Sequence, residues 1–173
     1  RPDQDAIGSL IGLGLALEKS GKQVQMVLAD SIATGMRFLE GTEKVTKTIS
    51  KPFDLFVSLD CSDPNRLGKA LPEGTRVDIN IDHHLSNLNF GRLNLVEPEN
   101  VATSALIAEH MINWGLEMDK SIATALLVGI LGDSLGFRTS NTSSQTLRLA
   151  AELIDYGISM SELYTKTLVR RSF

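Results

Sequence analysis

The sequence predicts an α/β protein with three α/β/α layers, a mostly parallel sheet and a helix-rich C-terminal part. The first observation is that short apolar runs alternate with segments that carry helical signals, at residues 23–28, 54–59, 77–81 and 90–95. This alternation favours a parallel sheet, because parallel strands need crossover connections. The second observation is that apolar residues recur at helical spacing through most of the chain after residue 100.

The first predicted element is a helix at residues 6–20, an apolar-rich stretch that Gly21 ends. No strand pattern precedes this helix, although helices of α/β proteins follow strands. We therefore expect a strand upstream of Arg1. Asp3 and Asp5 stand just before the helix, where a carboxylate can cap the first turn and favour the positive end of the helix dipole.

Two short helical turns are predicted between the strands, at residues 36–39 and 62–70. The apolar run at 54–59 ends at Asp60, and the run at 77–81 ends at Asp82. In a parallel sheet such ends lie at the carboxyl edge, which is where α/β folds hold ligands.

Apolar residues at helical spacing predict four helices in the C-terminal part, at residues 101–114, 121–131, 145–156 and 160–170. The second is so apolar that we expect it to be buried. Thr103 and Ser104 stand in the first turn of the first helix and are interpreted as capping residues, the alternative being that their amides bind a phosphate.

The composition limits the classes of function. A chain of 173 residues, 42% of them hydrophobic, suits one domain with a full core. A net charge of −4 argues against binding to duplex nucleic acid, which needs a basic surface, but allows a small nucleotide or a short single-stranded oligoribonucleotide. The single Cys61 excludes an intramolecular disulfide, and no apolar run of membrane-spanning length occurs. We expect a cytoplasmic protein that does not enter a membrane.

The sequence Asp82-His83-His84 ends the apolar run at 77–81 and holds two of the three histidines of the chain. A solvated turn that happens to contain histidines is the simpler interpretation, because short motifs give many false matches. The third histidine, His110, is expected at the surface of the helix at residues 101–114.

Carboxylates at the ends of several apolar segments favour the functional interpretation. Besides Asp82, these are Asp3, Asp5, Asp60 and Asp133. Each would carry a costly unpaired charge unless a cation compensated it. An oxygen-rich set with few imidazoles suits Mn²⁺ or Mg²⁺ better than a tetrahedral zinc site. Two such ions, roughly 3.5–4 Å apart, are typical of phosphoryl-transfer sites.

Four segments, in order along the chain, resemble the motifs of the DHH family of phosphoesterases. They are residues 1–9, residues 59–66, Asp82-His83-His84 and residues 132–137. The resemblance covers the whole chain, and we expect residues 1–173 to form the catalytic domain of that family. It is closest to the branch of nano-RNases and 3′-phosphoadenosine 5′-phosphate phosphatases, on the evidence of residues 133–142.

The resemblance implies a role for each of these residues. Asp3 would bind the first metal ion and Asp5 the second, while Asp60 would bridge both. His83 and Asp133 would complete the second site. His84 would lie beside the reacting phosphate, and His84 and Asp82 are the expected catalytic residues.

Substrate binding is assigned to Arg66, Arg138 and Ser134, which follow the acids of the second and fourth motifs. Arginine can hold phosphate oxygens by bidentate contacts, although both arginines can equally be solvated surface residues. Cys61 stands beside Asp60 and is interpreted as a small buried hydrophobic residue rather than a soft ligand.

The family also implies parts that these residues lack. A metal-binding histidine of the first motif would stand two positions before Arg1, and a smaller substrate-binding domain with a Gly-Gly-Gly-His signature would follow. The implied activity is hydrolysis of short oligoribonucleotides or 3′-phosphoadenosine 5′-phosphate by a water activated by two Mn²⁺ ions, with Mg²⁺ possible. The alternatives are a manganese-dependent inorganic pyrophosphatase, a cyclic-dinucleotide phosphodiesterase and a degenerate nucleotide-binding module. A homodimer is a further possibility.

Overall fold

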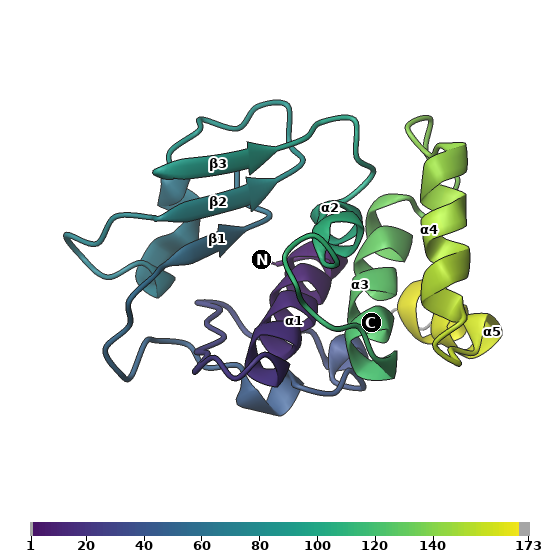
Figure 1. Cartoon of the computed structure of the whole chain (residues 1–173), viewed down its shortest axis with the longest axis horizontal. Coiled ribbons are helices and arrows are strands. Elements are labelled where there is room, and N and C mark those ends of the chain that lie inside the picture. The colour runs from purple at the N-terminus through teal and green to yellow at the C-terminus, as the bar shows by residue number, and fades with distance from the viewer. Residues whose placement is uncertain (1, 170–173) are drawn as a thin grey trace.

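A computed structural model describes residues 2–169 (Figure 1). Its centre is a parallel sheet of order β1-β2-β3, formed by Val57–Leu59, Ile79–Asp82 and Leu93–Val96. The predicted α/β class and its parallel sheet are therefore confirmed. The strands are shorter than predicted at their first residues, and β2 continues through Asp82.

Strand β2 is the central strand and is mostly buried, as expected of a parallel strand with a neighbour on each side. Its apolar residues pack into the core, but Asn80 is also fully buried. The side-chain amide of Asn80 donates to the carbonyl of Cys61 at 3.2 Å, so the polar group has a partner in the loop after β1.

The helix-rich C-terminal part is confirmed. After β3 come α2 Thr103–His110, α3 Lys120–Asp133, α4 Ser144–Ile154 and α5 Met160–Tyr164, which continues as a π-helical segment at Thr165–Val169. The predicted end of the last helix at residue 170 lies outside the described residues.

Helices α1 and α2 contact the sheet, while α3 packs against both of them and against α4, further from the strands. The first of these helices, α1, spans Gln4–Lys19, close to the predicted 6–20. Figure 1 shows this order, with the sheet on one side of the molecule and α4 and α5 on the other.

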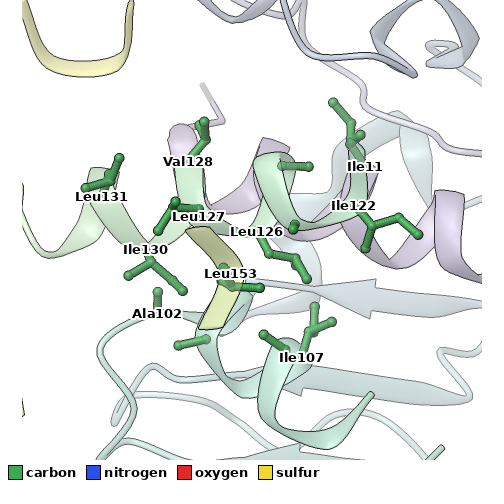
Figure 2. Close-up of a cluster of buried hydrophobic side chains, with 14 of the residues drawn as sticks. Ile11, Ala102, Ile107, Ile122, Leu126, Leu127, Val128, Ile130, Leu131 and Leu153 are labelled. Carbon is green, nitrogen blue, oxygen red and sulfur yellow. The ribbon is translucent and has the colours of Figure 1, made fainter. Parts of the chain in front are cut away.

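The hydrophobic core is built around α3, which is buried as predicted. Leu126, Leu127, Ile130 and Leu131 are fully buried on this one helix, and Figure 2 shows them among side chains of α1, α2 and α4. A helix that is apolar on all sides needs neighbours on all sides, which the surrounding helices supply.

The contact between α1 and α3 is closer than side chains would allow. A Cβ on Gly8 of α1 would lie 2.5 Å from the carbonyl oxygen of Ala125 on α3, and 2.9 Å from the amide nitrogen of Gly129. Two helices can therefore approach backbone to backbone here. This contact brings the first turn of α1 beside the last turn of α3.

The predicted strand at residues 23–28 is wrong. Val27 forms one isolated parallel bridge with Thr46, and no named strand includes this segment in the part of the chain that the structure describes. The expected helical turn at 62–70 is present as the 3₁₀ segment Pro64–Ala70, whereas the 3₁₀ segment Thr34–Met36 shares only Met36 with the turn predicted at 36–39. A strand pattern becomes a strand only where another strand pairs with it, and local sequence does not specify that partner.

No helix among residues 2–169 is long and apolar enough to cross a membrane.

The last described helical segment returns to the start of α1, where the side-chain amide of Gln4 donates to the carbonyl of Thr167 at 2.7 Å. The first and last parts of the described chain thus meet next to Asp5.

Candidate metal centre

Asp5 lies in the first turn of α1 and is fully buried. Its two carboxylate oxygens accept hydrogen bonds from the backbone amides that begin α2, Thr103 N–H at 2.6 Å and Ser104 N–H at 2.9 Å. The positive end of α2 thus compensates a buried negative charge. The interpretation of Thr103 and Ser104 as capping residues is wrong, because Ala102 is the N-cap and the side chain that accepts the first amides of this helix is that of Asp5.

Gly129 leaves the space in which this contact forms. A Cβ there would lie 2.8 Å from Oδ1 of Asp5 and 2.7 Å from Cβ of Ser104. Four residues later, α3 ends at Asp133. The same close packing of α1 and α3 therefore sets the distance between the carboxylates of Asp5 and Asp133.

Asp60 follows β1 directly and adopts a backbone φ of 52°, which is uncommon for a residue other than glycine. Its backbone N–H donates to the carbonyl of Ile81 at 3.0 Å, and its Oδ1 accepts the hydroxyl of Thr103 at 3.0 Å. The sheet and α2 therefore hold a residue in a conformation that costs energy, as is typical of functional sites.

His83 supplies the side chain on which these carboxylates converge. Its Nδ1–H donates to the carbonyl of Asn100 at 3.2 Å, which leaves Nε2 as the nitrogen that can take up a proton or bind a cation. Nε2 lies 3.1 Å from Oδ2 of Asp133 and 3.8 Å from an oxygen of both Asp5 and Asp60. This buried nitrogen nevertheless has no hydrogen bond of acceptable geometry.

His84 points its Nδ1 toward Asp82, with 2.7 Å between Nδ1 and Oδ1. Because a carboxylate only accepts, Nδ1 carries the proton. Asp82 is fully buried, and its Oδ1 also accepts the backbone N–H of His83 at 2.9 Å. The two predicted catalytic residues are thus hydrogen-bonded to one another, and Asp82 orients the imidazole of His84.

The carboxyl groups of Asp5 and Asp60 resist ionisation in the protein without metal. Burial, reinforced by the charge of Asp133, raises the pKa of Asp5 to about 6. Burial, with the charges of Asp5 and Asp3, raises the pKa of Asp60 to about 9. Burial lowers the pKa of His83, but the contact with Asp133 and the charges of Asp5 and Asp60 outweigh it and raise the pKa to about 9. Without a metal ion, Asp5, Asp60 and His83 therefore bind protons more tightly than they would in water.

Asp82 behaves differently. Burial opposes its ionisation, but the hydrogen bonds from His84 and Asn87 outweigh that effect and hold its pKa below the ordinary value. Asp82 is therefore an ionised acceptor rather than a proton donor.

The donor set fits a divalent cation. Two groups of side chains bring their ligand atoms within 4.8 Å of one another, Asp60 with His83 and His84, and Asp5 with His83 and Asp133. His83 belongs to both groups. Carboxylates with a minority of imidazoles are a fitting environment for Mn²⁺ or Mg²⁺.

Four of the predicted site residues belong to neither candidate ligand group and form other contacts. Asp3 is exposed and caps α1 by accepting Ala6 N–H at 2.9 Å. Arg66 and Arg138 are exposed, and their side chains contact Ser62 and the carbonyl of Leu135.

The fourth is Ser134, which is fully buried and accepts the backbone N–H of Phe137 at 2.9 Å. Its assignment to substrate binding, like those of Arg66 and Arg138, stays a prediction.

Two contributors had no counterpart in the sequence analysis. Asn100 acts through its backbone carbonyl, a group every residue has, so no sequence signal could identify it. Asn87 donates from its side chain to Oδ2 of Asp82, and its position three residues after His84, in a polar loop between two predicted strands, was a signal that could have been used.

Comparisons with known proteins agree with this site. Residues 1–130 match the model of the DHH family, N-terminal domain. The bifunctional oligoribonuclease and PAP phosphatase NrnA of Thermus thermophilus is 41% identical over 164 residues, which cover 94% of this chain and 49% of that protein. A probable manganese-dependent inorganic pyrophosphatase of Thermotoga maritima is 33% identical over 118 residues, which cover 62% of this chain and 20% of that protein.

The fold has a solved counterpart in an exopolyphosphatase-related protein from Bacteroides fragilis, with a TM-score of 0.84 at 23% identity, covering 99% of this chain and 54% of that one. This chain spans about half the length of the curated NrnA relatives that it matches. With the family model covering most of its length and the acids and histidines of its motifs gathered at one site, the chain belongs to the DHH family.

Proposed function

We propose that this chain is the metal-binding lobe of a phosphoesterase that hydrolyses short oligoribonucleotides and 3′-phosphoadenosine 5′-phosphate. The observation that carries the proposal is the buried Nε2 of His83, which lacks a hydrogen bond although carboxylates of Asp5, Asp60 and Asp133 surround it. A divalent cation is the partner that such a set of groups is missing. The substrate class rests on the likeness to the Thermus thermophilus oligoribonuclease and PAP phosphatase.

The cofactor in this proposal is a pair of Mn²⁺ ions, with Mg²⁺ as the alternative. Asp3 would bind the first ion, Asp5, His83 and Asp133 would hold the second, and Asp60 would bridge both. When bound, such ions activate water and neutralise charge on the transferred phosphoryl group. The likeness to a probable manganese-dependent pyrophosphatase and the oxygen-rich donor set support manganese.

His84 is the proposed acid and base of the protein itself. Its Nδ1–H is engaged by the ionised Asp82, which leaves Nε2 to exchange a proton with the substrate or the leaving group. The side chain of His84 is 34% exposed, so a substrate can reach it, whereas that of Asp82 is fully buried. Asp82 thus fixes the tautomer and orientation of His84, a task carboxylates perform for histidines in many active sites.

The substrate contacts in this proposal come from two sources. Arg66, Arg138 and Ser134 stand near the motif acids in sequence and would contact phosphate groups after a local rearrangement. The main substrate grip would come from a second, smaller domain of the whole protein, since the curated relatives are about twice as long as this chain.

An inorganic pyrophosphatase is the second candidate, favoured by the 33% identity to the Thermotoga maritima protein. The metal lobe serves both reactions, because each transfers a phosphoryl group to water. Only the substrate preference separates these candidates.

The test is hydrolysis by the intact protein, loaded with Mn²⁺, of a panel containing a diribonucleotide, a pentaribonucleotide, 3′-phosphoadenosine 5′-phosphate, a cyclic dinucleotide and pyrophosphate. We expect kcat/KM to be highest for the diribonucleotide and 3′-phosphoadenosine 5′-phosphate. Preference for pyrophosphate would replace the proposed function by its alternative, and hydrolysis of none of the five substrates would refute both.

A further inference from the structure

We propose that Asn87 is a positioning residue that holds the carboxylate of Asp82 in the orientation that His84 requires. The inference deepens the proposed function, on which it rests for the catalytic role of His84. Asn87 lies in the loop between β2 and β3, three residues after His84. It is half-buried, and neither metal-ligand group includes it.

The orientation of the Asn87 side chain follows from its neighbours. Its amide oxygen accepts the backbone N–H of Asn89 at 2.6 Å, so the NH₂ group faces the other way. There the NH₂ group meets three acceptors, Oδ2 of Asp82, Oδ1 of Asn80 at 2.8 Å and the carbonyl of Cys61 at 3.2 Å. Since all three atoms only accept hydrogen bonds, the side-chain amide of Asn87 must be oriented with its nitrogen on this side.

The loop that carries Asn87 is held by two backbone hydrogen bonds, one within the loop and one to the segment that follows β1. The backbone N–H of Asn87 donates to the carbonyl of His84 at 3.0 Å, and that of Leu88 donates to the carbonyl of Ser62 at 2.9 Å. The position of the amide is therefore fixed by backbone contacts that do not involve Asp82. A donor held in this way can impose an orientation on the carboxylate that it contacts.

The two oxygens of Asp82 have separate partners. Oδ2 accepts from Asn87, while Oδ1 accepts from His84 and from the backbone N–H of His83. Losing the contact at Oδ2 would free the carboxylate to rotate about its side-chain bonds, which would move Oδ1 away from His84. The contact of Asn87 thus acts on His84 through Asp82.

His84 has a competing acceptor if Asp82 turns away. Its Nδ1 is 2.7 Å from Oδ1 of Asp82 and 3.7 Å from Oδ1 of Asp60. Asp60 and His84 already share one candidate ligand group, so a His84 that turned to Asp60 would serve as a metal ligand and leave its place as proton donor. Asn87 therefore separates the histidine that works on the substrate from the carboxylate that serves the metal.

The experiment compares the intact wild-type protein with Asn87→Asp and Asn87→Ala. Asn87→Asp keeps the shape and the acceptor for Asn89 but replaces the donor to Asp82 by a carboxylate oxygen. Asn94→Ala is the matched control, because Asn94 also ties a turn, by donating to the carbonyl of Gly91 and accepting its N–H, but lies outside the site.

The first readout is independent of activity. The ¹⁵N chemical shifts of the His84 ring, measured without a paramagnetic metal, report which nitrogen carries the proton. We expect a single Nδ1–H form in the wild type and in Asn94→Ala, and a mixture of forms in both Asn87 variants. Unchanged His84 shifts in both Asn87 variants would overturn the inference whether or not the protein cleaves any substrate.

The second readout is kinetic. We expect kcat of the Asn87 variants to fall by about 10- to 100-fold, the usual effect of losing a residue that orients an active-site group, with KM changed by less than about threefold. The double variant Asp82→Asn/Asn87→Ala should lose little more kcat than Asp82→Asn alone, because Asn87 acts through Asp82. Full additivity of the two losses would show that Asn87 acts independently of Asp82. Absence of phosphoesterase activity in the wild type would refute the proposed function and leave the ¹⁵N result to decide on Asn87.

Discussion

The backbone N–H of Ser104 donates a hydrogen bond of 2.9 Å to Oδ1 of Asp5, across 99 residues of sequence. The contact joins the starts of α1 and α2, and Gly129 of α3 leaves the room for it. Three helices thus determine the position of one carboxylate. The metal site consequently depends on helix packing as much as on its ligands.

Replacing Gly129 by Ala tests this dependence. The new Cβ would meet Oδ1 of Asp5 at 2.8 Å and Cβ of Ser104 at 2.7 Å, and buried backbone limits relaxation. We expect the free energy of unfolding to fall by about 1–3 kcal/mol through overpacking. We also expect Mn²⁺ affinity, measured by calorimetry, to fall at least about tenfold, because the carboxylate must move.

Gly14→Ala is the matched control in α1. A Cβ there would meet only the flexible side chain of Met26, away from Asp5. This variant should lose stability but keep the Mn²⁺ affinity of the wild type. Equal loss of affinity in both variants would mean that the effect comes from general destabilisation.

The Asp60→Asn variant should lose most of the activity of the intact protein. Asp60 is 8% exposed, lies against the Nε2 of His83 and is the proposed bridge between two ions. We expect kcat to fall by more than about 100-fold, as when one strong electrostatic contact to a transition state is removed. Asp63→Asn is the control, because Asp63 caps the Pro64–Ala70 segment outside both ligand groups. Similar losses in the two variants would show that the wrong aspartate has been chosen.

His83→Gln should weaken Mn²⁺ binding by more than about tenfold, because His83 belongs to both ligand groups. His110→Gln is the control, since His110 pairs with Glu97 at 3.1 Å and stacks on Trp114, as a boundary residue. Anomalous scattering from Mn²⁺-loaded crystals gives an independent measurement. A strong peak away from Asp5, Asp60, His83 and Asp133 would contradict the assignment.

The stability of the metal-free protein should fall as the pH rises from about 4 to about 9. The raised pKa values of Asp5, to about 6, and Asp60, to about 9, mean that the folded chain keeps protons that the unfolded chain releases near pH 4. His83, with its pKa raised to about 9, acts in the same direction, because its contribution is complete below pH 6.5 and lost toward pH 9.

The measurement is the urea midpoint at pH 6 and at pH 9, with a chelator and with Mn²⁺. The metal should restore stability most at pH 9, because bound cations require deprotonated ligands. Asp60→Asn should flatten the pH dependence of the metal-free protein. A metal-free protein more stable at pH 9 than at pH 6 would be incompatible with these pKa shifts.

Much of the fold could be predicted because its signals are local. The run at 77–81 and the apolar α3 were assigned correctly, since burial in the centre of a fold requires continuous apolar residues. The segment at 23–28 has an equally good strand pattern but forms only the bridge between Val27 and Thr46. Pairing depends on a second strand, and the sequence of the first does not reveal whether one is present.

For the site, the ligand side chains could be predicted from the sequence, but the backbone groups that hold them could not. Asp5, Asp60, His83 and Asp133 were found from their positions at segment ends and from family resemblance, and the structure brings them together. Thr103 and Ser104 were interpreted as capping residues, but their backbone amides bind the carboxylate of Asp5. A backbone group leaves no trace in the sequence, so interactions of this kind need coordinates.

The close contact of α1 with α3 has a consequence for how the protein is made. Helix α1 is synthesised before α2 and α3, but Asp5 finds its amide partner at Thr103, 98 residues later, and its packing partner on α3 later still. The strands β1 to β3 pair with near neighbours in sequence and can form meanwhile. During synthesis the apolar face of α1 and the carboxylate of Asp5 therefore stay exposed to water until α2 and α3 have formed. Packing of α1 against these two helices is the step that assembles the site.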